Sequence, residues 1–272
     1  MKQKVSQLNA PALAGVINQS TMAGVISEIK NYIFDGASMF DLHMEWITHL
    51  DDTQLATIMN CTNLPILALN YCSTPADADL EALEQARVDS LLRAVKAGAA
   101  GIDMQGYTFH HPSKSGFYGE DKYSFTKGNP KEVITDEKII ARQCDLIEQI
   151  HAMDREVLLS CHPGIPMTSD QVVELALFLE QRNPDIIKIV TVAENEDDLH
   201  ESIRAMMALK KEVKTPVTYH ANGAAGTLSR IVNPILGGHI AFCVDRYDNQ
   251  SFVEQPQLKA VREIIDNIQR NI

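Results

Sequence analysis

Short apolar runs alternate with amphipathic stretches from one end of the chain to the other. The apolar runs are too short for helices and are rich in β-branched residues, which is typical of buried strands. Eight such strands are predicted, at Ala14–Gln19, Met39–Trp46, Pro65–Tyr71, Gly101–Gln105, Val157–His162, Ile186–Val192, Val217–His220 and Ile240–Val244. The helices predicted between them include Asp77–Ala97, Asp136–Met153, Ser169–Gln181, Glu196–Lys210 and Gln257–Ile268.

This alternation predicts an α/β fold with a parallel sheet, and eight repeats predict a closed (β/α)8 barrel, or TIM barrel. The 272 residues fit one such barrel, so we expect a single domain over residues 1–272. The alternative is an open, doubly wound sheet. No GxGxxG or GxxxxGK[ST] motif follows a predicted strand, which argues against the nucleotide-binding form of that alternative.

Residues 107–130 interrupt the alternation after the fourth predicted strand. The segment is rich in aromatic side chains, histidine, lysine, glycine and proline, so it is too polar for a core and too irregular for a helix. A long loop in a compact domain is usually functional or disordered. In a barrel it would emerge on the catalytic face and could form a lid. An ordered surface excursion or an oligomer contact is the alternative.

Composition narrows the classes of partner. The chain has 24 basic and 36 acidic residues, for a net charge of −12, and its lysines and arginines are scattered. This balance argues against nucleic acid and against anionic membranes. The five cysteines form no CxxC pair, and the N-terminus lacks the apolar core of a signal peptide. We therefore expect reduced thiols in a cytoplasmic protein.

Lys188 stands in the middle of the apolar run Asp185–Ala193. Lysine is almost never fully buried unless a partner or a function requires it. Burial disfavours the ammonium form and lowers the pKa of the amine, and a neutral amine is what Schiff-base chemistry needs. The alternative is a lysine that extends along an edge strand until its amine reaches water.

His162 ends the predicted strand before that of Lys188. The carboxyl ends of barrel strands carry the chemistry of this fold, and neighbouring strands lie about 4.8 Å apart. A histidine there could shuttle protons beside a lysine nucleophile. Because successive side chains in a strand face opposite ways, Cys161 points away from His162, which argues against a Cys–His nucleophilic pair.

Other polar residues end predicted strands. Asp41, His43 and Glu45 share one face of the second, where a divalent metal or, as we favour, a hydrogen-bonded network would satisfy them. The remaining residues of this kind are Asn70, Gln105 and His220. Arg230, after the glycine-rich Asn222–Gly226, suits a carboxylate or phosphate, although a surface ion pair is the alternative. We expect neither a cofactor nor a bound metal.

The order and spacing of several segments resemble the type I 3-dehydroquinate dehydratase family. They are Leu-Leu-Ser-Cys-His162, Asp185-Ile-Ile-Lys188-Ile, Pro216-Val-Thr through Gly226-Thr-Leu-Ser229-Arg230-Ile, Gly237 and Phe242. The resemblance implies a barrel, usually dimeric, in which Lys188 forms an imine with a ketone, His162 shuttles protons and Arg230 holds a carboxylate. Ser251 and Gln255 have the spacing of a Ser/Gln pair that binds substrate in the family.

Departures from the family pattern fall in the substrate-binding shell. Asp41 and His43 stand where the family has Glu–Trp–Arg, Asn70 replaces an arginine, and Gln105 replaces the glutamate that partners the histidine. Glutamine cannot ionise, but it can still orient an imidazole ring. The resemblance thus implies imine chemistry on a related but different hydroxy ketone.

We therefore expect a lyase that dehydrates 3-dehydroquinate or a related β-hydroxy ketone or keto acid, with Lys188, His162 and Gln105 as catalytic residues. Its partners would be a small keto substrate, with an acidic group held by Arg230, and a second copy in a homodimer. One alternative is a class I aldolase that uses the same imine on a sugar or sugar phosphate. The other is a non-catalytic homologue that binds a metabolite or a protein partner.

Overall fold

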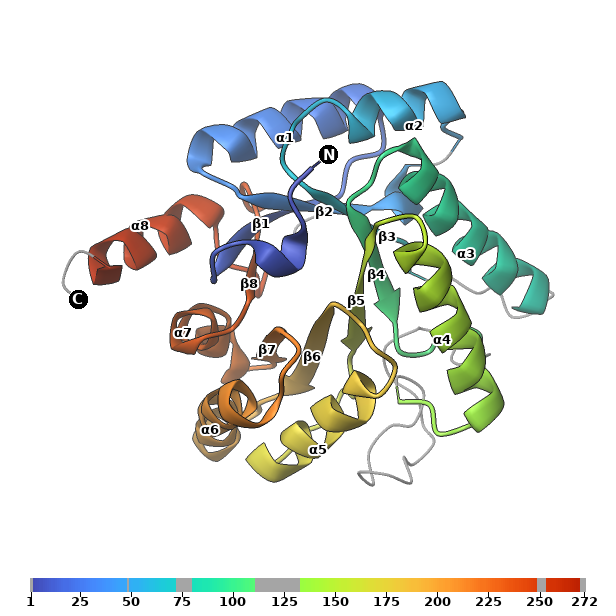
Figure 1. Ribbon diagram of the computed structural model, residues 1–272. Coiled ribbons are helices and arrows are strands. Elements are labelled where there is room, and N and C mark those ends of the chain that lie inside the picture. Colours follow the sequence, from blue (N-terminus) through green and yellow to red (C-terminus); the bar gives the residue numbers. More distant parts are fainter. Residues whose placement is uncertain (1, 48, 72–79, 111–132, 249–252, 270–272) are drawn as a thin grey trace.

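The structure is a computed structural model that describes residues 2–47, 49–71, 80–110, 133–248 and 253–269. Eight parallel strands alternate with helices (Figure 1). The strands are β1 Ala12–Ile17, β2 Met39–His43, β3 Ile66–Leu69, β4 Gly101–Gln105, β5 Glu156–Cys161, β6 Ile186–Val192, β7 Val217–Asn222 and β8 Ile240–Cys243. The helices are α1 Met22–Asp35, α2 Asp52–Met59, α3 Leu80–Ala97, α4 Glu137–His151, α5 Ser169–Glu180, α6 Glu196–Glu212, α7 Ser229–Leu236 and α8 Leu258–Gln269.

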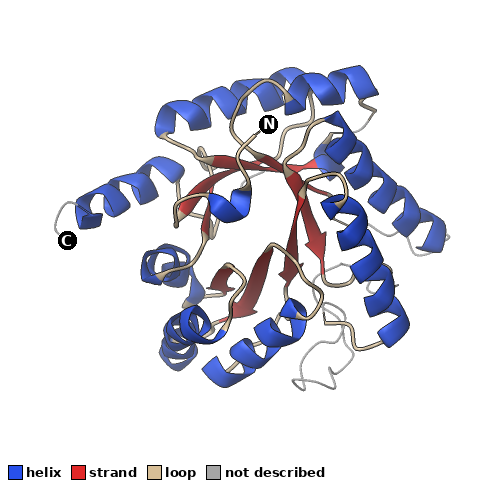
Figure 2. Ribbon diagram, viewed as in Figure 1, coloured by secondary structure: helices blue, strands red, loops and turns tan. Residues whose placement is uncertain are grey.

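The helices surround the strands, as Figure 2 shows, so the prediction of a (β/α)8 barrel is confirmed. The strand ladder runs in the order β7-β6-β5-β4-β3-β2-β1-β8. At the seam between β7 and β8, His239 N donates to Val217 O over 2.8 Å and Ile240 N donates to Thr218 Oγ1 over 2.9 Å. Individual bonds, rather than a strand ladder, therefore complete the barrel at this seam.

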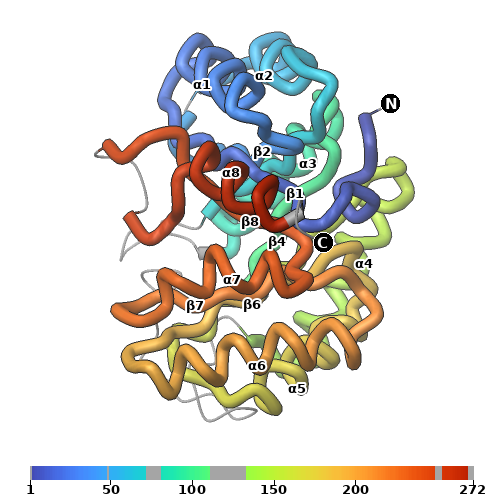
Figure 3. The backbone as a smooth tube through the Cα atoms, turned by 90° about the vertical axis from the view of Figure 1, so that its left-hand side faces the viewer, coloured from blue at the N-terminus to red at the C-terminus, as the bar shows by residue number. Residues whose placement is uncertain are grey.

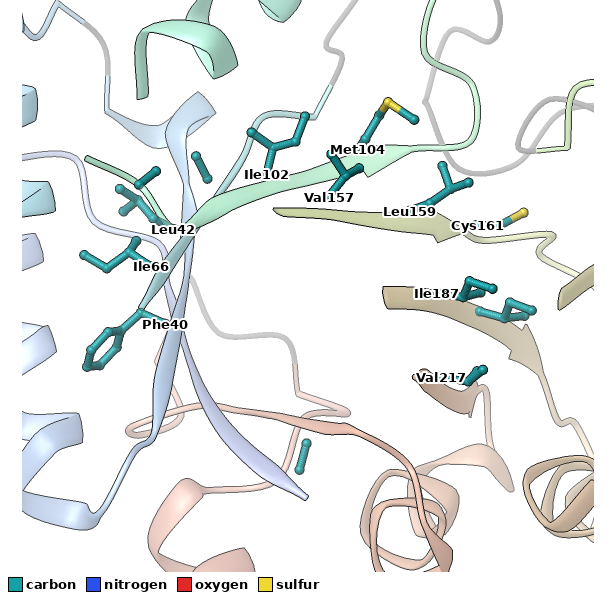
Figure 4. Packing of buried hydrophobic residues seen from close by; sticks show 14 of the residues in the cluster. Phe40, Leu42, Ile66, Ile102, Met104, Val157, Leu159, Cys161, Ile187 and Val217 are labelled. Carbon is teal, nitrogen blue, oxygen red and sulfur yellow. The ribbon is translucent and has the colours of Figure 1, made fainter. Parts of the chain in front are cut away.

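Strand alternation divides the buried side chains between two cores. One set faces outward and packs under the helices, and Figure 4 shows Phe40, Leu42, Val157, Leu159 and Cys161 among this set. The other set fills the barrel interior, where an apolar layer contains Val16, Met39, Leu67, Leu158 and Ile186. Cys161 thus faces the helices, as predicted.

The N-terminal segment closes the end of the barrel at which the strands begin. Its 3-10 helix η1 (Val5–Gln7) buries Val5 in the inner apolar cluster. The Glu156 carboxylate accepts from Val5 N and Ser6 Oγ, and His239 Nε2 lies 2.8 Å from Val5 O. The cavity described below lies at the opposite end of the barrel, where the strands finish.

Some strand boundaries differ from the prediction. β2 ends at His43, and Met44–Trp46 forms a 3-10 helix, η2, so Glu45 is not on the strand face of Asp41. Tyr107 and Thr108 are fully buried, which corrects the expectation that the whole segment 107–130 is too polar for a core. Residues 111–130, and with them the lid prediction, lie outside the described residues.

Figure 3 shows α1 and α2 at the top of the molecule and α5 and α6 at the bottom, and local capping fixes where several helices begin. Helix α5 starts at a capping box in which Thr168 and Gln171 satisfy each other's backbone N–H groups. Asn195 Oδ1 accepts from Asp198 N over 3.0 Å at the start of α6. Within the described ranges, no helix combines the length and apolar character needed to cross a bilayer.

Candidate functional site

A cavity opens at the carboxyl end of the barrel strands. Its lining comes from β2, β6, β7 and β8, from the residues that follow β3 and β5, from α7 and from the segment before α8. The lining residues are Asp41, His43, Tyr71, His162, Lys188, Val190, His220, Asn222, Arg230, Phe242 and Gln255. Side chains that are far apart in the sequence thus meet where barrels carry their chemistry.

Lys188 reaches this cavity from inside the barrel. Its strand β6 pairs with both β5 and β7, so Lys188 is not on an edge strand, and its residue is only 5% exposed. Nζ lies 3.0 Å from Asp103 Oδ2 and 4.4 Å from the centroid of the Phe242 ring. The alternative in which the lysine extends out to water is therefore wrong.

Asp103 is the carboxylate that pairs with Lys188 and stabilises its buried side chain. It lies on β4 and is fully buried. Burial raises the pKa of its carboxyl group, and the charge of Asp41 raises it further, while the Lys188 ammonium acts in the opposite direction. The net rise means that Asp103 accepts a proton more readily than a carboxylate in water. Asp103 can therefore take up the proton that Lys188 must lose before it attacks a ketone.

His162 follows directly after β5 and lines the cavity. Burial, together with the nearby charges of Lys188 and Arg230, holds its pKa well below the usual histidine value of 6.5. The pKa of His220 on β7 is lowered by burial and by the same two cations. Both rings are therefore neutral at neutral pH, and a neutral imidazole can accept a proton.

Asp41 and His43 on β2 and Glu45 in η2 form a polar cluster. His43 Nδ1 lies 3.0 Å from Glu45 Oε1, and Nε2 lies 3.6 Å from Asp41 Oδ2. Burial lowers the pKa of His43, but hydrogen bonds to both carboxylates, and their charges, outweigh it and raise the pKa to about 9. Among the described side chains, no cluster of three or more His, Cys, Asp or Glu residues could hold a metal ion.

Arg230 points into the cavity because the start of α7 is bonded to β7. Ser229 Oγ accepts from Ala221 N over 2.8 Å and donates to Gly226 O over 2.6 Å. Arg230 Nη2 donates to Asn222 Oδ1 and lies 3.9 Å from Glu254 Oε2. Arg230 is buried, so the surface ion pair considered from the sequence does not describe it.

Gln105 and Asn70 lie outside the cavity lining. The Gln105 amide donates to Asp103 O over 2.8 Å, and its oxygen accepts from Arg87 Nη1 over 2.7 Å. Asn70 Nδ2 donates to Ser90 Oγ over 2.7 Å. Gln105 thus supports the Asp103 backbone, and its contact with His162 stays a prediction. Gln255 lines the cavity, whereas Ser251 lies outside the described residues.

Several lining or supporting residues were not predicted as site residues from the sequence. Asp103 had a detectable signal, because it shares the inward parity of Gln105 on the same strand. Tyr71 lies between two histidine rings, 5.6 Å from His43 and 6.1 Å from His162 by ring centroids. Phe242 and Asn222 are brought to the cavity by closure of the barrel, which local patterns do not reveal.

Comparisons with known proteins find sequence matches over about half of the chain. The family model described as type I 3-dehydroquinase matches residues 132–272, just over half of the chain. A curated 3-dehydroquinate dehydratase from Aromatoleum aromaticum is 25% identical over 138 residues, which cover 49% of this chain and 52% of the relative. The chain thus matches its curated relatives over about half of their length or less.

Solved structures extend the similarity of the fold to the whole chain. A 3-dehydroquinate dehydratase from Geobacillus kaustophilus superposes with a TM-score of 0.74 at 14% identity, covering 99% of this chain and 97% of the other. A type I 3-dehydroquinate dehydratase from Clostridium difficile gives 0.74 at 12% identity and covers 100% of both chains. At such identities the likeness shows the barrel fold alone.

Proposed function

The chain belongs to the type I 3-dehydroquinase family, and we propose that it is a dehydratase that removes water from a β-hydroxy ketone through an imine on Lys188. The observation that carries the proposal is the buried Lys188 amine, 3.0 Å from Asp103 and in one cavity with His162. A lysine nucleophile, a proton acceptor beside it and a neutral base on the next strand end are the parts that imine-based elimination needs.

In the first half of the reaction, Lys188 is converted into an electron sink. Asp103 takes the ammonium proton, and Nζ attacks the ketone carbon. Loss of the carbonyl oxygen as water gives an iminium, whose positive charge the Asp103 carboxylate stabilises once that proton has left with the water. The iminium acidifies the neighbouring C–H because the C–H electron pair can move into the C=N bond.

In the second half, His162 works as both base and acid. Its neutral ring accepts the proton from the carbon next to the iminium, which leaves an enamine. The enamine electrons then expel the β-hydroxyl group, and the protonated His162 donates the proton that makes the leaving group water. Water hydrolyses the conjugated imine, releases the unsaturated ketone and restores Lys188. These steps use only side chains of the chain itself.

The substrate proposed first is 3-dehydroquinate, because the related proteins carry that name. The residues around Lys188 also favour a related β-hydroxy ketone or keto acid. Asp41 and His43 stand at the end of β2, and their charged, hydrogen-bonding groups suit the hydroxyl groups of a cyclic or sugar-like substrate.

The aldolase alternative uses the same lysine but needs a phosphate or sugar site near Arg230. One backbone donor of the glycine-rich turn, Gly223 N, is occupied by Glu254 Oε1 at 3.1 Å. A carboxylate at that position repels a phosphate, so this observation argues against a sugar phosphate at the glycine-rich turn.

Product analysis tests the proposal. Purified protein is incubated with 3-dehydroquinate and with other hydroxy ketones, and products are followed by ultraviolet absorbance and NMR. The expected result is loss of water and a conjugated enone, absent in Lys188→Met. Release of an aldehyde fragment would identify an aldolase instead, and thermal stabilisation without turnover would identify a non-catalytic binding protein.

A further inference from the structure

His220 is a second neutral imidazole in the cavity, and neither half of the proposed reaction uses it. The residue lies on β7, is buried, and lines the cavity together with Lys188 and His162. Burial and the charges of Arg230 and Lys188 hold the pKa of its ring well below 6.5. The ring can therefore accept a proton at neutral pH, as a base for the chemistry at Lys188 must.

The strand register places the two histidines on either side of Lys188. Lys188 pairs with Thr218 on β7, and Val190, the next inward residue of β6, pairs with His220. On the other side of β6 lies β5, and His162 follows directly after that strand. Two residues of a strand span about 6.6 Å, a distance that the four-carbon stem of a lysine can cover. An adduct on Nζ is thus flanked by one imidazole from each neighbouring strand.

Imine formation moves two protons from the lysine nitrogen to the departing oxygen. The ammonium group starts with three protons, the iminium keeps one, and the water that leaves carries the other two. Asp103 takes the first when it deprotonates the ammonium. The second moves after Nζ has attacked, when the adduct carries two protons on nitrogen and a negative charge on oxygen. Direct transfer would pass through a strained four-membered ring, so a base that relays this proton lowers the barrier.

Other groups near Lys188 are less suited to this relay. Thr218 Oγ1 accepts from Ile240 N over 2.9 Å at the seam of the barrel, so its oxygen is engaged in the fold. Asp103 already holds the first proton at this stage of the reaction. His162 is the base proposed for the neighbouring C–H, on the β5 side of the adduct. The relay between nitrogen and oxygen therefore falls to the imidazole on β7.

We propose that His220 is a catalytic residue that relays the second proton from nitrogen to oxygen during imine formation, while His162 serves the elimination. The inference rests on the proposed function, because it divides the proton transfers of the same mechanism between two rings. The His220 ring accepts a proton from the adduct nitrogen and donates it to the oxyanion, and the proton held by Asp103 then completes the water that leaves. In hydrolysis the ring accepts a proton from the attacking water and returns it to nitrogen. It ends each step neutral.

The double variant His162→Gln with His220→Gln tests this division against His162→Gln alone. The His162→Gln change blocks elimination, so the imine with 3-dehydroquinate accumulates and its formation can be timed. Samples are reduced with borohydride at successive intervals, and the fraction of Lys188 that carries the adduct is measured by peptide mass spectrometry. His162→Gln with His200→Gln, an exposed change on α6, is the matched control.

The variant that also carries His220→Gln is expected to form the adduct about 100-fold more slowly but to reach the same final fraction, because a proton relay changes the rate and not the equilibrium. The control should match His162→Gln. Equal rates with and without His220, or a lower final fraction, would overturn the proposal. So would an adduct that forms in the wild type but not in His162→Gln. No adduct in the wild type would instead overturn the proposed function, and this inference with it.

Discussion

The Nζ atom of Lys188 lies 3.0 Å from Oδ2 of Asp103 in the interior of the barrel, with the two side chains coming from β6 and β4. Strand β5 lies between β4 and β6 in the sheet. The pair therefore joins two strands that do not hydrogen-bond to each other. A buried ion pair holds its partners in place, but it leaves a costly charge if one partner is removed.

Asp103→Asn is therefore expected to destabilise the fold by about 3 kcal/mol, because it leaves the Lys188 ammonium buried without a carboxylate. The double variant Asp103→Asn with Lys188→Met should recover most of that loss, since neither charge remains. Urea unfolding of the wild type, both single variants and the double variant gives the coupling free energy. If the stability losses of the two single variants added up to that of the double variant, a direct interaction between the two side chains would be contradicted.

His162→Gln is expected to reduce kcat by about 10²- to 10⁴-fold, the usual contribution of a general acid–base group. The imine on Lys188 should still form, because His162 acts after it. His200→Gln, an exposed change on α6, serves as the control. A variant that loses both imine formation and turnover would show that His162 acts earlier than proposed.

The pH profile gives a separate test of His162. Burial and nearby cations depress its pKa, so the ring stays neutral as the pH falls through the ordinary value of 6.5. The acid limb that His162 contributes to kcat/KM, which reports the free enzyme, should therefore lie below pH 6.5. An acid limb centred at or above that pH would contradict the environment described for this ring.

The sequence could predict the barrel and the residues whose position follows from strand parity. Lys188 and His162 were placed correctly at the cavity because β5 and β6 alternate regularly up to their carboxyl ends. The end of β2 could not be predicted, because Met44–Trp46 turns into a 3-10 helix without glycine or proline to mark it. Asp103 had the right parity, but its pairing with Lys188 depends on barrel curvature.

The environment of Arg230 was the least predictable part of the site. Its partner Glu254 comes from the segment after β8, and its position depends on how that segment folds over the β7–α7 turn. No periodicity in the sequence reports such a contact. The seam between β7 and β8 is a similar case, because the apolar run of β8 does not reveal that a strand ladder is missing on one side.

His43 makes the stability of the protein depend on pH in the alkaline range. Its pKa is raised from 6.5 to about 9 in the folded state. The contribution is fully present below pH 6.5 and is lost as the pH rises through about 9. Relative to His43→Gln, the wild type should lose up to about 3 kcal/mol of unfolding free energy across this window, at about 1.36 kcal/mol per pKa unit. If the unfolding free energies of both proteins changed in parallel between about pH 6 and about pH 10, the raised pKa of His43 would be contradicted.

Cys161 precedes His162 in the sequence but packs among the outward-facing residues of the barrel. Cys161→Ala is therefore expected to leave imine formation and turnover unchanged, and to cost only about 1 kcal/mol of stability through lost packing. Steady-state kinetics and urea unfolding check both parts. A large loss of kcat in a folded Cys161→Ala protein would support the Cys–His nucleophilic pair that strand parity argues against.

Trapping of the imine tests the central claim most directly. The protein is incubated with 3-dehydroquinate and with neutral hydroxy ketones, reduced with borohydride, digested and analysed by peptide mass spectrometry. The account predicts a stable adduct on Lys188, absent in Lys188→Met and still formed in His162→Gln. No adduct on Lys188 with any of these ketones, in protein shown to be folded, would contradict it.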